Sequence, residues 1–131
     1  MVSRTVRQAL IVEDNSEIAE ELKTILSDMG YKVTTLDNPA EVTDTLGTHQ
    51  YEVALLNMQL PDMSWRGTFN AIKSASRSTT VIMMSKEVDE EAKRTALTAG
   101  AYGTMERPLD GARLVNLISP RNDGMFVSLK S

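Results

Sequence analysis

Residues 9–16, ALIVEDNS, begin with four consecutive apolar side chains and end with four polar ones. A short apolar run bounded by a polar break is typical of a strand that is buried on both faces, as in a parallel sheet. The polar break offers several N-caps for a helix. The apolar residues that follow fall on one helical face, with Gly30 as the expected stop; they are Ile18, Leu22, Ile25, Leu26 and Met29.

The same alternation of an apolar run and a helix-period segment recurs four more times along the chain. Further strands are expected at residues 31–36, 53–56, 81–84 and 103–105. Helices are expected from Pro39 to about Leu46, around Phe69 and Ile72, from Val88 to Ala99, and from near Asp110 to just before Pro120, with a loop at 57–66. Alternating strands and helices predict an α/β fold in which helices cover both faces of a parallel sheet.

The totals exclude several classes of function. At 131 residues, with 41% apolar and 24% charged residues, the chain is expected to fold around one core and to be soluble. The net charge is −4 and the basic residues are scattered, so direct binding to nucleic acid is not expected. The chain has no cysteine, and the apolar stretch 9–12 is too short for a signal peptide, so we expect a cytoplasmic protein without a membrane anchor.

The expected domain spans residues 8–119, after an N-terminal extension of residues 1–7. Residues 120–131 are expected to form a linker or C-terminal tail, because Arg121-Asn122-Asp123-Gly124 has a linker's composition. The residues after this linker are too few for an output domain. We therefore expect either a lone module or a piece of a longer protein.

Polar side chains follow the predicted strands at the positions where an open α/β sheet carries its site. In such sheets the binding crevice lies beyond the carboxyl ends of the strands. The residues in these positions are Glu13, Asp14, Asn57, Ser85 and Arg107. We expect two acids, an amide, a hydroxyl and a guanidinium group to converge on one pocket.

Four blocks of sequence resemble the receiver domains of bacterial two-component response regulators. They are LIVEDN at 10–15, LLNMQLPDM at 55–63, VIMMS at 81–85 and AGAYGTMERP at 99–108. Their order and spacing match that family. The resemblance implies a flavodoxin-like (βα)5 three-layer sandwich whose parallel strands have the order 2-1-3-4-5.

The resemblance also implies a phosphorylation site, of which this chain keeps only a part. In the family an acidic pair and a backbone carbonyl hold Mg²⁺, an aspartate accepts the phosphoryl group, and a Ser/Thr hydroxyl and a lysine contact it. Glu13 and Asp14 match the acidic pair, Gln59 supplies the carbonyl position, and Ser85 matches the hydroxyl. Two positions do not match: Asn57 replaces the acceptor aspartate, and Arg107 replaces the lysine.

These departures predict a pocket that does not take up phosphate. A neutral amide is a far weaker nucleophile than a carboxylate, so Asn57 should not form an acyl phosphate. With one anionic ligand fewer, Mg²⁺ should bind weakly or not at all. Arg107 could instead bridge to Asp14 or Glu13 in the place of the metal. Thr104, where the family carries an aromatic switch residue, is too small to act as such a switch.

A receiver-like sequence with Asn57 and Arg107 is compatible with three hypotheses of function. The first is a receiver-like interaction module that is not phosphorylated at the usual site and contacts a sensor kinase, a phosphotransfer protein, another receiver or an output domain, with a homodimer as a further possibility. The second is an ordinary phosphate-accepting receiver captured as an Asp-to-Asn variant. The third, an enzyme, is not expected, because the chain lacks the D-x-D, G-x-G-x-x-G and G-x-x-x-x-G-K-[ST] motifs.

Three further residues have a structural and a functional interpretation. Trp65, expected in a loop, either packs locally or contacts a partner or covers the pocket. Tyr102 lies on a face that the family uses for partners, although a partly exposed tyrosine there needs no special role. His49 has no second ligand at metal spacing and is expected in a solvated loop.

Overall fold

The computed structural model describes residues 7–47, 50–59, 65–85, 90–106 and 111–122. Strands and helices alternate along these residues, as the sequence predicts. The strands are β1 (Gln8–Val12), β2 (Lys32–Leu36), β3 (Val53–Asn57), β4 (Thr80–Ser85) and β5 (Gly103–Glu106). The helices are α1 (Ser16–Asp28), the short 3₁₀ helix η1 (Pro39–Glu41), α2 (Val42–Leu46), α3 (Trp65–Ala75), α4 (Glu90–Ala99) and α5 (Gly111–Asn122).

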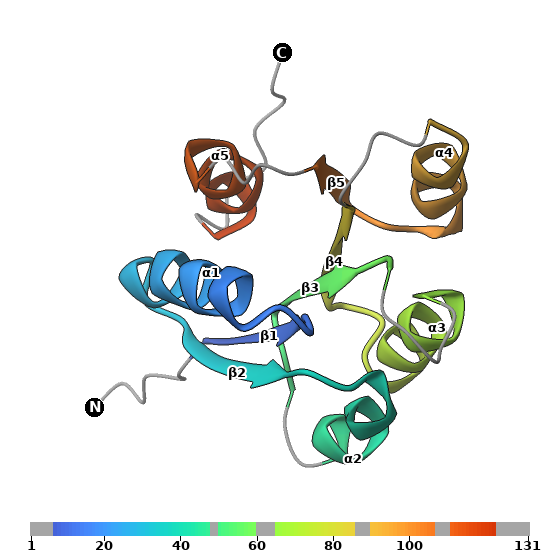
Figure 1. The fold of residues 1–131 in the computed structure, drawn as a ribbon, viewed down its shortest axis with the longest axis horizontal. Helices are drawn as coiled ribbons and strands as arrows, with labels where there is room; N and C mark the ends of the chain where they lie inside the picture. Colours follow the sequence, from blue (N-terminus) through green and yellow to red (C-terminus); the bar gives the residue numbers. More distant parts are fainter. Residues whose placement is uncertain (1–6, 48–49, 60–64, 86–89, 107–110, 123–131) are drawn as a thin grey trace.

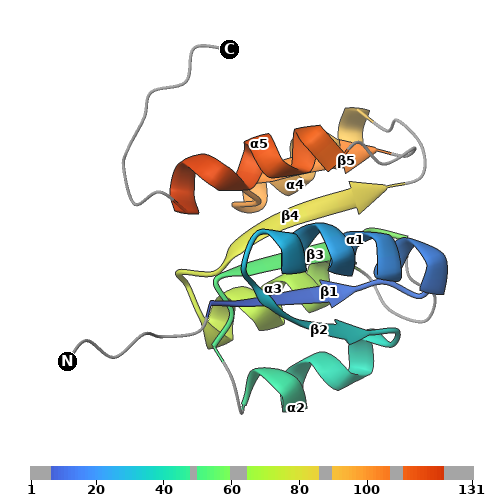
Figure 2. The same ribbon diagram turned by 90° about the vertical axis from the view of Figure 1, so that its left-hand side faces the viewer.

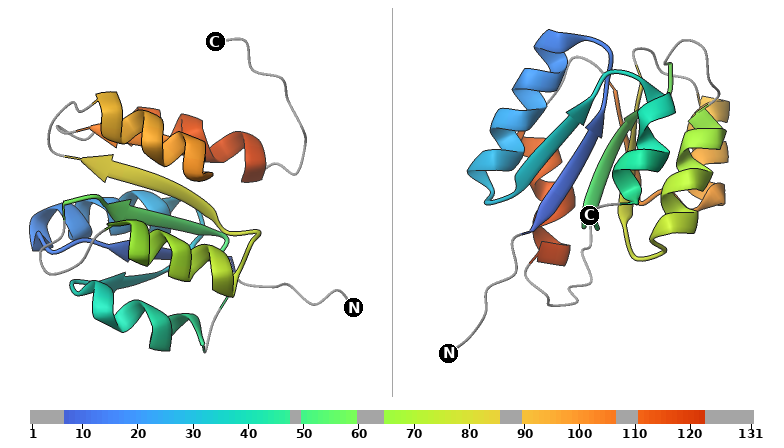
Figure 3. Two further views of the ribbon diagram at one scale, coloured as in Figure 1. Left: turned by 90° about the vertical axis from the view of Figure 1, so that its right-hand side faces the viewer. Right: turned by 90° about the horizontal axis from the view of Figure 1, so that it is seen from below.

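All five strands are parallel and lie in the order β2-β1-β3-β4-β5 (Figure 1). Helices α1 and α5 cover one face of the sheet, which Figure 2 shows from the front. Helices α2, α3 and α4 cover the other face (Figure 3). This is the flavodoxin-like three-layer arrangement that the sequence resemblance implied.

The sheet separates two hydrophobic clusters, because successive side chains of a strand point to opposite faces. The cluster under α1 and α5 contains Ala9, Ile11, Val53, Leu55, Leu22, Leu26, Leu114 and Ile118. The cluster under α2, α3 and α4 contains Leu10, Val12, Ala54, Leu56, Val42, Phe69, Ile72 and Ala96. Met83 and Met84, expected to fill the core, are buried on opposite sides.

The predicted helix boundaries are confirmed at several ends. The Asn15 side chain caps α1 by accepting from the Ile18 N–H at 3.1 Å. Asn38 caps the 3₁₀ turn in the same way, with Pro39 at its first position. Gly30 follows α1 with φ of 98°, a left-handed conformation that is strained for residues with a Cβ atom.

Four expected boundaries were wrong. Asn57 is the last residue of β3 and Ser85 the last residue of β4, whereas both were expected just after their strands. Trp65 and Arg66 open helix α3 instead of lying in a loop, because the Trp65 and Phe69 rings, one helical turn apart, contact each other edge to face. Helix α5 continues through Pro120 to Asn122.

Several expectations lie outside the described residues. They concern His49, Arg107, the helix starts expected at Val88 and near Asp110, the N-terminal extension of residues 1–6 and the tail beyond Asn122. Among the helices that the structure describes, none combines the length and apolar composition that a membrane crossing requires.

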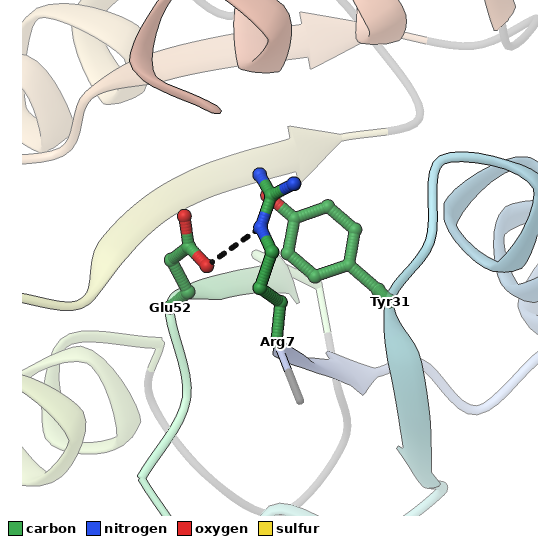
Figure 4. A network of polar contacts seen from close by, with 3 residues as sticks. All are labelled: Arg7, Tyr31 and Glu52. Carbon is green, nitrogen blue, oxygen red and sulfur yellow. Dashed lines mark hydrogen bonds and ion pairs between the residues drawn. The ribbon is translucent and has the colours of Figure 1, made fainter. Parts of the chain in front are cut away.

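A polar cluster joins the amino ends of three neighbouring strands (Figure 4). Arg7, just before β1, donates through Nε to Glu52 Oε1 at 3.2 Å and through Nη2 to the Tyr31 hydroxyl at 3.2 Å. Its guanidinium carbon also lies 4.8 Å from the centroid of the Tyr31 ring. Burial alone would lower the pKa of Arg7, but the Glu52 hydrogen bond and the nearby Tyr31 and Glu52 groups raise it overall. The guanidinium group therefore stays charged, and it links the start of β1 to Tyr31 before β2 and to Glu52 before β3.

We predict that Arg7→Ala lowers the free energy of unfolding by about 1 kcal/mol, because the variant loses the ion pair and the cation–π contact at a partly exposed site. Urea denaturation would measure the loss. Lys93→Ala is the control, since the 3.8 Å pair of Lys93 with Glu90 joins two side chains on the surface of one helix. The control should change stability by no more than about 0.5 kcal/mol. Equal losses in the two variants would contradict a special role for the Arg7 cluster.

Candidate functional site

The carboxyl ends of β1 and β3 bring Glu13 and Asn57 into contact. Val12 pairs with Leu56 in the register of these strands, so the next residue of each strand lies at the same level. Both side chains are buried, with 2% exposure for Glu13 and 3% for Asn57. The Asn57 amide nitrogen donates a hydrogen bond to Glu13 Oε2 at 3.0 Å. A buried carboxylate is thus held by a buried amide.

The Glu13 carboxylate also accepts from the backbone. The N–H of Asn15 donates to the same oxygen, Oε2, at 3.1 Å. The backbone N–H of Glu13 itself donates to the Leu36 carbonyl at the end of β2, at 2.9 Å. Both the position of Glu13 and the orientation of its carboxylate are therefore fixed by hydrogen bonds.

Asn57 acts as donor and acceptor at once. While its nitrogen donates to Glu13, its oxygen Oδ1 accepts from the backbone N–H of Gln59 at 2.8 Å. An ionised aspartate could accept the Gln59 bond, but it has no hydrogen to give to Glu13. The amide is therefore the side chain that satisfies both neighbours without a cation.

The remaining predicted site residues lie around this pair. Asp14 is exposed, and Gln59 is exposed while its backbone N–H is bonded to Asn57. Ser85 is half-buried and lies one residue beyond Met84, the partner of Asn57 in the β3–β4 register. Among the described residues, the structure shows a direct contact between Glu13 and Asn57, while Ser85 lies at the end of the neighbouring strand β4. The hypothesised bridge from Arg107 is not tested, because residues 107–110 are not described.

Thr104 lies in β5, an edge strand of the sheet, and is buried. It faces Met83 in the β4–β5 register and is 9% exposed. Its backbone carbonyl accepts from the Arg113 side chain at 3.1 Å. A small, buried threonine here has no large ring to move between an inward and an outward position.

The possible metal ligands among the described residues do not fit a magnesium site in which several carboxylates bind the ion. Mg²⁺ in proteins takes carboxylate oxygens in a regular octahedron together with water. Within the part of the chain that the structure describes, no three His, Cys, Asp or Glu residues are grouped so that they could hold a metal. In addition, Glu13 Oε2 already receives two N–H hydrogen bonds, and the amide nitrogen of Asn57 presents hydrogens rather than a lone pair.

An acidic groove that the sequence analysis missed runs beside the pair. Its volume is about 320 Å³, and it lies between the start of α1, the end of β2 and η1. Five acids line it: Glu13, Asp14, Glu20, Asp37 and Glu41. Glu20 lies in α1 and Glu41 in η1, while Asp37 directly follows β2, a strand end that the sequence analysis did not inspect.

Fold and site together define a class of protein. Residues 9–119 match the family model of the response regulator receiver domain, so the chain belongs to that family. It is the receiver domain of a two-component response regulator, a class of domain that works through contacts with other proteins.

The sequence identity to individual curated relatives is low. The chain is 28% identical over 101 residues to the cell cycle transcriptional regulator CtrA of Caulobacter vibrioides, covering 77% of this chain and 44% of CtrA. It is also 28% identical over 108 residues to the cell cycle response regulator CtrA of Brucella ovis, covering 82% and 47%. The chain thus spans about half the length of these relatives.

Solved structures show the same fold. A CheY-like receiver domain from Methanospirillum hungatei superposes with a TM-score of 0.83 at 24% identity, covering 92% of this chain and 96% of the other. The receiver domain of a putative LuxO repressor from Vibrio parahaemolyticus gives 0.82 at 20% identity, covering 92% of each chain.

We predict that Asn57→Asp destabilises the domain by about 2 kcal/mol or more at neutral pH without divalent cations, because it places two buried carboxylates against each other. Repulsion from Glu13 raises the pKa of the new carboxyl group above its value in the unfolded chain. The variant should therefore gain stability as the pH falls through that raised pKa and lose it as the pH rises. Denaturation curves measured over a pH series, with and without millimolar Mg²⁺, would test both effects, and Mg²⁺ should stabilise the variant more than the native chain.

The matched control exchanges donor and acceptor. Glu13→Gln combined with Asn57→Asp restores one amide and one carboxylate, so it should recover most of the lost stability without Mg²⁺. If the single variant were as stable as the native chain in the absence of Mg²⁺, the Asn57–Glu13 bond would not have the role assigned to it.

Proposed function

We propose that this receiver domain is not phosphorylated at residue 57 and signals through protein contacts that do not depend on phosphorylation. The observation that carries the proposal is the 3.0 Å hydrogen bond from Asn57 Nδ2 to Glu13 Oε2. It supports a pocket in which an amide hydrogen bond stabilises the buried carboxylate, whereas the family pocket, with three carboxylates and one lysine, needs Mg²⁺ to balance its charge.

The chemistry of the amide supports the same conclusion. Formation of an acyl phosphate requires a carboxylate oxygen to attack phosphorus, and an amide oxygen is a much weaker nucleophile. Here that oxygen also accepts from the Gln59 N–H at 2.8 Å, and the nitrogen donates to Glu13. An attacking Asn57 would have to give up these hydrogen bonds inside a buried site, which adds to the barrier.

We further propose that the domain needs no cofactor, and that any Mg²⁺ bound near Asp14 is weak. Two N–H donors already stabilise the charge of Glu13, so a cation gains less by approaching it. Thr104 fits this proposal, because a small buried side chain gives phosphorylation no aromatic rotamer to move.

The proposed role is that of a binding module and not of an enzyme. Its partners would be proteins: a sensor kinase, a phosphotransfer protein, another receiver or an output domain. The CtrA proteins are named as regulators, and the match covers less than half of their length. An output domain, joined to this chain or separate from it, is therefore one partner to test. We place this interaction in the cytoplasm, where two-component receivers meet their kinases.

We predict that the native chain gains no phosphoryl group when it is incubated with acetyl phosphate and Mg²⁺. Intact-mass spectrometry should show no adduct of about 80 Da, because residue 57 offers no ionised nucleophile. The double variant Asn57→Asp with Arg107→Lys restores both side chains that the family carries, and it should gain the adduct under the same conditions.

The control variant is Arg107→Lys alone, which keeps Asn57 and should stay unmodified. An adduct on the native chain that maps to the carboxyl edge of the sheet would overturn the proposal. It would favour the second hypothesis from the sequence, that of a receiver which accepts phosphate in the ordinary way.

A further inference from the structure

A groove lies between α3 and α4, on the face of the sheet opposite α1 and α5. These two helices stand apart (Figure 1, and Figure 3, left). The groove holds a cavity of about 410 Å³, which is in the range of ordinary ligand pockets. Helix α3 contributes Trp65, Arg66 and Phe69 to its lining, and α4 contributes Arg94 and Thr98.

The groove continues toward the start of α4. A second cavity of about 220 Å³ shares Trp65, Arg66 and Thr95 with the first and extends to Glu91. Because the two cavities have lining residues in common, they form one elongated depression along α4. Arg66, Glu91, Arg94 and Thr98 are exposed, so the depression is open to solvent along its length.

Aromatic side chains form one wall of the groove. The rings of Trp65 and Phe69 meet edge to face, with centroids 6.2 Å apart and planes at 76°. Phe69 is 2% exposed and belongs to the core, while Trp65 is half-buried and packs against the same core cluster. The indole is therefore held in place by the core and presents its remaining surface to the groove, which is a preorganised apolar contact.

The described lining of the larger cavity is positively charged, although the whole chain is acidic. The chain carries −4, yet among the described residues this cavity is lined by Arg66 and Arg94 and by no acidic side chain, while Glu91 lines the smaller cavity. The Arg66 guanidinium lies 5.5 Å from the centroid of the Trp65 ring. Arg94 comes from the opposite helix, so both helices place a cationic group at the groove. Trp and Arg are the residue types enriched where protein interfaces gain most of their affinity.

We propose that this groove binds an acidic segment of a partner protein that carries an apolar side chain. The exposed Arg94 guanidinium would pair with a carboxylate of this segment in the forked geometry that arginine favours, while the apolar side chain contacts Trp65. An open groove that follows a helix suits an extended or helical segment better than a compact small molecule. This inference rests on the proposed function, because it supplies a surface for contacts that need no phosphorylation.

The chain itself provides the probe for this test. Trp65 is its single tryptophan, so the intrinsic fluorescence of the native protein reports directly on the groove. The ligand is a pool of short synthetic peptides made of Asp, Glu, Leu and Phe. The matched pool replaces the two acids by Asn and Gln. Backbone amide chemical shifts, recorded in the same titrations, locate the binding surface.

We expect the acidic pool to shift the Trp65 emission and the amide signals of α3 and α4, with the amide-containing pool binding at least about tenfold more weakly. Arg94→Ala should weaken the acidic pool about tenfold, since it removes one charged hydrogen-bonding partner. Arg77→Ala removes an exposed arginine outside the groove and should leave binding unchanged.

Several outcomes would overturn the docking surface. They are no shift with either pool, equal binding of both pools, or shifts confined to other elements. Shifts in the groove with AMP or GMP, but not with peptides, would assign it to a small anion instead. The phosphorylation test has a separate readout: an adduct at residue 57 with intact peptide binding would overturn the proposed function alone, and the reverse result would overturn the groove alone.

Discussion

A buried carboxylate at the end of β1 imposes the main constraint on this domain. Glu13 is 2% exposed, and a charge at that depth must be neutralised or hydrogen-bonded. Among the described residues, the N–H groups of Asn15 and Asn57 meet part of this requirement. This hydrogen bonding limits the chemistry of the pocket, because the Asn57 side chain already donates a hydrogen bond to Glu13. In the proposed function, the loss of phosphorylation at residue 57 and the weaker need for a metal both follow from this one amide.

The sequence was sufficient to place Glu13 and Asn57 at one edge of the sheet. Each follows a short apolar run, and alternation within parallel strands carries both to the face under α1 and α5, where Ile11 and Leu55 also point. What the sequence could not supply was the direction of the hydrogen bond and the unequal burial of neighbouring acids. Glu13 is buried and Asp14 exposed, which depends on where the chain turns after β1. The acidic groove was also missed, because Glu20 and Glu41 belong to helical segments and Asp37 was not considered as a strand-end residue.

The surface between α3 and α4 shows a different limit of prediction. Trp65 was assigned to a loop because the third helix was recognised only from Phe69 and Ile72. In the structure, Trp65 and Phe69 lie one helical turn apart in α3 and contact each other edge to face. The fold of the chain, by contrast, was predictable in order and type, since five apolar runs alternate with helical segments. Errors fell at the ends of elements, where single residues decide between competing conformations.

The division of the core by the sheet has an evolutionary consequence. Glu13 and Asn57 belong to the side of α1 and α5, whereas the groove draws on side chains from α3 and α4 across the sheet. Since the backbone of the strands separates the two layers, mutations can accumulate in one without repacking the other. If phosphorylation at the strand ends is lost in evolution, the fold is therefore retained, and residues of α3 and α4 can change in ways that create contacts with new partners.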